Sequence, residues 1–121
     1  MSNTIDVRHV GDVAIVDVAG RITLGEGSVT LRDTVRDLAK SGQKKVLLNL
    51  AEVSYIDSSG IGELVAAYTS VRGHGGEMKL LSLMKRVQDL LQITKLYTVF
   101  EVFDNEPAAL RSFEKASATT P

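Results

Sequence analysis

The sequence of 121 residues contains no cysteine. This absence excludes disulfide bonds, thiolate catalysis and cysteine-ligated zinc, and nothing in the chain calls for an oxidising compartment, so we expect a cytoplasmic protein. Aromatic residues are also scarce, at 5% of the chain, and the net charge is only -1. A chain with no basic run and few aromatic side chains lacks the groups that usually bind a nucleic-acid backbone, so we expect no direct contact with nucleic acid.

Long apolar runs are equally lacking. A membrane-spanning helix needs roughly 20 consecutive apolar residues, and no segment of this chain approaches that length. Residues 1–10 alternate apolar and polar positions, without the cationic start and apolar run of a secretory signal. We therefore expect no membrane insertion.

The chain does contain enough apolar residues for one hydrophobic core. Hydrophobic residues make up 44% and charged residues 24% of the sequence, which is typical of a compact globular domain. The length leaves no room for a second folding unit. We assign residues 1–115 to a single domain and the small, polar residues 116–121 to a flexible C-terminal tail.

Hydrophobic periodicity predicts an alternation of strands and helices. Residues 5–10 and 13–19 flank the turn-forming pair Gly11 and Asp12 and predict an antiparallel hairpin. Residues 46–50 are almost continuously apolar, which is typical of a central strand covered on both faces. The other predicted elements are a helix capped by Ser28, a helix from Ile61, a strand over 78–83, a helix with Val87, Leu90, Leu91 and Thr94 on its inner face, a strand over 99–103 and a helix opened by Pro107.

This order, β-β-α-β-α-β-α-β-α, predicts an α/β fold. Two leading strands followed by right-handed crossovers build a mixed β-sheet of about five strands, with about four helices mainly on one face.

The densest run of small polar residues, 53–62, follows the predicted central strand. Functional sites of open α/β sheets gather at the carboxyl ends of strands, where a loop enters a helix whose first amides lack partners. In one interpretation Asp57 or Ser58 only caps the helix, while Gly60 and Gly62 allow close packing. In the other, a serine accepts a phosphate, which the positive end of a helix dipole favours. Both interpretations remain open on spacing alone.

Three stretches resemble one protein family: residues 48–50 (Leu-Asn-Leu), residues 56–62 (Ile-Asp-Ser-Ser-Gly-Ile-Gly) and residues 75–78 (Gly-Gly-Glu-Met). They closely resemble the anti-sigma factor antagonists of bacteria and the wider STAS family. The order of elements agrees with that family over residues 5–113. The resemblance implies a single STAS-like domain that acts as a regulatory switch and not as an enzyme.

The resemblance also implies a mechanism. Ser58 takes the position at which, in that family, an anti-sigma factor with serine kinase activity adds a phosphate. A PP2C-type phosphatase removes this phosphate again. The unphosphorylated form binds the anti-sigma factor and frees a sigma factor, whereas the phosphorylated form is released. The implied partner surface combines the motif with a preceding loop: Asp57, Ser58, Ser59, Gly60 and Ile61, with Leu24, Gly25, Glu26 and Gly27. This loop departs from the shorter turn of many family members. In the alternative interpretation it is a plain solvent-exposed loop without a partner.

Within the family, the same domain also serves in stress-signalling assemblies and in lipid-transporting ABC systems. Outside the family, a phospho-aspartate receiver would place its acceptor near Asp57, but residues 105–107 supply no lysine and two strands come first. A serine hydrolase or a metal site would need imidazoles, and His9 and His74 lie far apart without suitable neighbours. We expect no metal and no cofactor.

Overall fold

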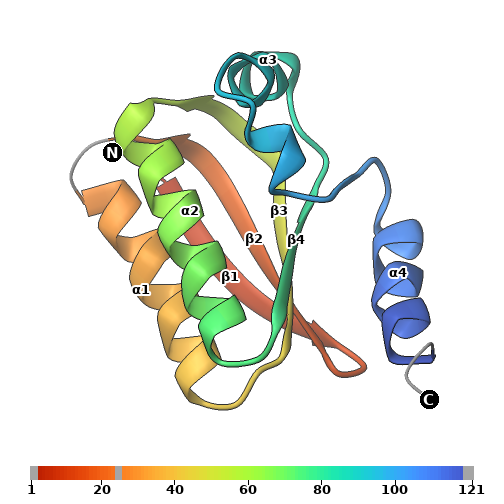
Figure 1. The fold of residues 1–121 in the computed structure, drawn as a ribbon. Coiled ribbons are helices and arrows are strands. Elements are labelled where there is room, and N and C mark those ends of the chain that lie inside the picture. Colours follow the sequence, from red (N-terminus) through yellow and green to blue (C-terminus); the bar gives the residue numbers. More distant parts are fainter. Residues whose placement is uncertain (1–2, 24–25, 119–121) are drawn as a thin grey trace.

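The computed structural model describes residues 3–23 and 26–118 and shows one α/β domain (Figure 1). The elements in chain order are β1 (Asn3–Val10), β2 (Val13–Ile22), α1 (Glu26–Lys40), β3 (Lys45–Ile56), α2 (Ser58–Gly73), β4 (Glu77–Leu81), α3 (Lys85–Ile93), the short 3-10 helix η1 (Leu96–Thr98), β5 (Val102–Phe103) and α4 (Glu106–Ala118). Apart from η1, this is the predicted order.

The five strands form one mixed sheet in the order β1-β2-β3-β4-β5. β1 pairs antiparallel with β2 through the predicted hairpin, and Gly11 adopts a φ of 61° in its turn. All other neighbours pair in parallel. The prediction of a mixed sheet with residues 46–50 at its centre is confirmed.

β3 continues to Ile56, well past the predicted end at Leu50. Residues 45–49 pair with strands on both sides, whereas the second half of β3 pairs only with β2 and contains two register shifts. In that half the apolar residues Val53 and Ile56 are buried, and the polar Glu52 and Ser54 face solvent. The long extension carries the chain directly to the start of α2.

Helices cover both faces of the sheet (Figure 1), with α1, α2 and α3 in one core cluster and α4 in the other. The larger core cluster joins the sheet to α1, α2 and α3 through residues such as Val35, Leu64 and Val87. A smaller cluster on the opposite face packs Phe113 of α4 against Ile15 and Leu47. The prediction of helices mainly on one face is confirmed, with α4 as the exception.

Three helix boundaries differ from the prediction. α1 begins at Glu26, so the prediction of Ser28 as its N-cap was wrong. α2 begins at Ser58 and not at Ile61. The backbone N–H of Ala108 donates to Asn105 Oδ1 at 2.9 Å, so Asn105 caps α4 one residue before Glu106. α4 continues to Ala118, beyond the predicted domain boundary at residue 115, and residues 119–121 lie outside the described chain.

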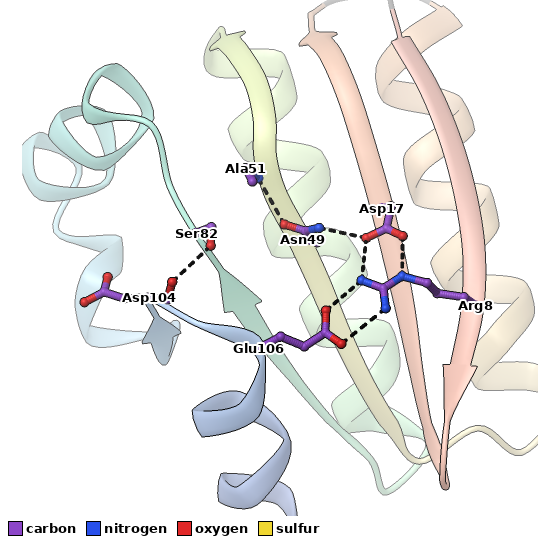
Figure 2. Close-up of polar contacts among 7 residues, drawn as sticks. All are labelled: Arg8, Asp17, Asn49, Ala51, Ser82, Asp104 and Glu106. Carbon is purple, nitrogen blue, oxygen red and sulfur yellow. Dashed lines mark hydrogen bonds and ion pairs between the residues drawn. The ribbon is translucent and has the colours of Figure 1, made fainter.

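A polar network ties α4 to the edge of the sheet (Figure 2). The guanidinium group of Arg8 donates to Asp17 at 2.6 Å and 3.2 Å and to Glu106 at 2.7 Å and 3.2 Å. Asn49 donates to Asp17 at 2.7 Å and accepts from the backbone N–H of Ala51 at 3.1 Å. The hydrogen bonds from Arg8, and secondarily that from Asn49, hold the pKa of Asp17 below its usual value against the opposing effect of burial.

We expect this network to make folding stability depend on pH. Since the pKa of Asp17 is lowered in the folded state, its contribution is present above the ordinary aspartate pKa of about 3.9 and is lost as the pH falls through the lower folded value. Asp17→Asn should cost roughly 1 kcal/mol at neutral pH, a small value because the side chain is 32% exposed. In urea unfolding at a series of pH values, the difference in free energy of unfolding between Asp17→Asn and wild type should become smaller in acid.

The matched control is Asp37→Asn on the exposed surface of α1, which should track wild type throughout. A stability difference for Asp17→Asn that stays constant down to the lowest pH would contradict the assignment.

Candidate functional site

A single residue, Asp57, separates β3 from α2. Its backbone is extended, with φ -103° and ψ -175°, and its carboxylate accepts a hydrogen bond from the backbone N–H of Gly60 at 2.8 Å. Asp57 is therefore the N-cap of α2, and it satisfies one of the orphan amides of the first turn. Of the two capping candidates in the sequence, the structure selects Asp57.

The start of α2 is pressed against the end of β2. The backbone N–H of Asp57 donates to the carbonyl oxygen of Ile22 at 3.2 Å. Gly60 is buried at this contact, and a Cβ atom built on it would lie 2.2 Å from the Ile22 oxygen and 2.5 Å from Ile56 Cγ1. Only glycine fits there, so Gly60 fixes how closely the helix approaches the sheet.

Ser58 is the first residue of α2 and is exposed, whereas Ser59 is half-buried. Among the residues that the structure describes, the Ser58 hydroxyl has no hydrogen-bond partner. The first turn of α2 contains no acidic residue. An anion on Ser58 would therefore meet the positive end of the helix dipole, with the Asp57 cap as the neighbouring negative charge.

A hollow of about 480 Å³ opens beside Ser58. One wall comes from the end of β3 and the start of α2, and the other from α3, which lies over the carboxyl end of β3 (Figure 1). The lining residues are Tyr55, Ile56, Asp57, Ser58, Arg86, Asp89, Leu90 and Ile93. Arg21 of β2 stacks on the ring of Tyr55, with its guanidinium carbon 5.1 Å from the ring centre.

The family model of the STAS domain matches residues 4–109 of this sequence. The chain belongs to the STAS domain family. An anti-sigma-B factor antagonist of Bacillus subtilis (strain 168) is 32% identical to it, over 84% of this chain and 92% of its own length.

Solved structures share the STAS fold. An anti-sigma factor antagonist from Mycobacterium paratuberculosis superposes with a TM-score of 0.79 at 19% identity, covering 92% of this chain and 93% of its own. The Bacillus cell fate determinant SpoIIAA in its phosphorylated form gives a TM-score of 0.72 at 16% identity, covering 91% of this chain and 99% of its own.

The structure of this STAS domain gathers the predicted motif at one end of the sheet. Ser58 is its exposed serine, and Asp57 and Ser59 are half-buried. Gly60 is buried and Ile61 is 8% exposed, so these two residues shape the site from beneath. Partner contact by any of the five remains a prediction.

The predicted loop of residues 24–27 is only partly described. Leu24 and Gly25 lie outside the described residues, and Glu26 and Gly27 belong to the first turn of α1, so the prediction of a loop was wrong for these two residues. The starts of α1 and α2 lie side by side (Figure 1). An ion pair of 3.5 Å joins Arg32 of α1 to Glu63 of α2. The start of α1 therefore lies beside the motif, and a partner surface shared by the two stays a prediction.

The contribution of α3 to the site was missed by the sequence reasoning. Arg86, Asp89 and Ile93 come from a segment some 30 residues beyond the motif, yet they line the hollow beside Ser58. One signal was available: Ile93 does not belong to the inner face of the predicted helix, and it is 76% exposed. An exposed isoleucine beside a functional motif is a candidate contact residue.

The two histidines lie at the other end of the domain. His74 directly follows the last residue of α2, about 24 Å from the start of a helix of this length. His9 pairs with Ala14 near the beginning of β2. Over residues 3–23 and 26–118 no three His, Asp or Glu side chains gather as metal ligands, and no described helix has the length and apolar character to cross a membrane.

Proposed function

We propose that this STAS domain is an anti-sigma factor antagonist controlled by phosphorylation of Ser58. The unphosphorylated form binds an anti-sigma factor that is also a serine kinase, and so frees a sigma factor in the cytoplasm. Phosphorylation of Ser58 releases the partner, and a PP2C-type phosphatase resets the switch. The domain itself performs no catalysis and touches no DNA.

The observation that carries this proposal is the position of Ser58. It is exposed at the first position of α2, while the neighbouring Asp57 already supplies the cap. The hydroxyl is therefore available to a kinase without loss of a structural hydrogen bond. Phosphate would add about -1.5 to -2 charges at a helix end whose dipole favours anions, so the fold can accept the change.

Relatives support the proposal in two ways. The Bacillus subtilis relative is an anti-sigma-B factor antagonist, and the shared family covers most of both chains. The phosphorylated SpoIIAA has the same fold, which is consistent with a STAS domain that carries a phosphate and stays folded.

We expect phosphorylation at Ser58 and not at Ser59, because Ser58 is exposed and Ser59 is half-buried within the first turn. The experiment incubates the protein with its cognate anti-sigma factor and labelled ATP, followed by phosphopeptide mapping. Ser58→Ala should abolish the label and Ser59→Ala should leave it largely intact.

Label on Ser59, or normal labelling of Ser58→Ala, would overturn the assignment. A pull-down from native cells supplies the second check. Capture of a soluble kinase by the unmodified protein supports the antagonist function, whereas capture of a membrane ATPase would identify a transporter subunit.

A further inference from the structure

Arg86 and Ser58 line one hollow from two different helices, α3 and α2. Arg86 is the second residue of α3, is exposed, and lines the same hollow as Ser58 and Asp57. Its neighbour Lys85 is already paired with Asp89 at 3.2 Å. In the part of the chain that the structure describes, the Arg86 guanidinium has no hydrogen bond and no ion pair.

We infer that Arg86 is the internal receptor for the phosphate on Ser58. This inference rests on the proposed function, because it takes Ser58 as the phosphoacceptor. A guanidinium group is planar and presents its donors as a fork that binds two phosphate oxygens at once. The hollow of about 480 Å³ leaves ample room for a phosphate between the two walls.

The charges around the hollow favour this pairing. Its two acidic residues are engaged elsewhere, since Asp57 accepts from the Gly60 N–H and Asp89 pairs with Lys85. Arg21 stacks on the ring of Tyr55 and is not among the residues that line the hollow. Among the lining residues Arg86 alone is cationic, so it is the residue that can pair with a phosphate dianion on Ser58.

The hollow is partly apolar. Tyr55 and Leu90 are half-buried lining residues, and Ile93 is an exposed one. A phosphate held by Arg86 would occupy the hollow, so that modification both adds charge and fills a space open to a partner's side chain.

The test uses the full chain with phosphoserine encoded at position 58, so that no kinase is needed. Phosphorus NMR titration gives the second pKa of the phosphate, which is ordinarily about 6. Arg86→Gln should raise this pKa by roughly one unit relative to wild type, at the low end of what an adjacent guanidinium does to an anion. Arg86→Lys should lie between, because it keeps the charge and loses the fork.

The control is Arg111→Gln, which removes the same charge from the exposed surface of α4 on the opposite face of the sheet. It should leave the phosphate pKa unchanged. A phosphate pKa that is equal in wild type and Arg86→Gln, or shifted equally by Arg111→Gln, would overturn the inference. Either result leaves the proposed function intact, which instead fails if the cognate kinase does not label Ser58.

Discussion

Ser58→Asp is expected to weaken binding to the anti-sigma factor by at least roughly a hundredfold. An anion that loses water at an interface without a partner costs several kcal/mol, and each 1.4 kcal/mol is a factor of about ten in affinity. Ser58 is exposed at the start of α2, so its side chain would lie at a partner surface formed there. Since aspartate carries less charge than phosphate, its effect should be smaller than that of the modification itself. Calorimetry at one salt concentration measures the affinities of wild type and of Ser58→Asp for the anti-sigma factor.

Two variants make this experiment specific. Ser58→Ala should bind like wild type and should not be released by the kinase, because it carries no charge and accepts no phosphate. Ser59→Asp places the same charge one residue later, at a half-buried position, and reports any general effect of an acidic first turn. Equal affinity of wild type, Ser58→Ala and Ser58→Asp for the cognate kinase would remove Ser58 from the interface.

The parts of the fold that could be predicted are those that local patterns specify. The hairpin around Gly11 and the continuous apolar run at residues 46–50 needed no knowledge of distant contacts, and both are confirmed. The start of α2 was placed only approximately. Sequence could not decide between Asp57 and Ser58 as its cap, because both side chains can accept the same hydrogen bond and only the backbone geometry selects one.

Features that depend on tertiary contacts could not be predicted. The second half of β3 alternates buried and exposed residues and pairs only with β2, whereas the prediction ended at the last residue of the continuous apolar run. The partnership of Arg86 with the Ser58 hollow depends on where α3 packs over the sheet, which no local pattern shows. The network of Arg8, Asp17 and Glu106 joins residues almost a hundred positions apart.

Gly60→Ala should cause the largest loss of stability of any single methyl added to the site. The new Cβ would lie 2.2 Å from the carbonyl oxygen of Ile22, a rigid backbone atom that also accepts the hydrogen bond of the Asp57 N–H. Relief requires α2 to move away from β2, which would disturb the cap as well. Overpacking typically costs about 1 to 3 kcal/mol, and a contact with rigid backbone belongs at the upper end of that range; the loss is measured as a lower urea midpoint at neutral pH.

The matched control is Gly62→Ala, two residues further along the same helix. Nothing lies within 4 Å of a Cβ built at Gly62, and the residue is exposed. Alanine has a higher helix propensity than glycine, so this variant should gain about 0.5 to 1 kcal/mol. The opposite signs of the two substitutions separate close packing against Ile22 from helix propensity. If Gly60→Ala also proved neutral or stabilising, α2 could not be held against β2 as described, and the rigid placement of Ser58 would have to come from another contact.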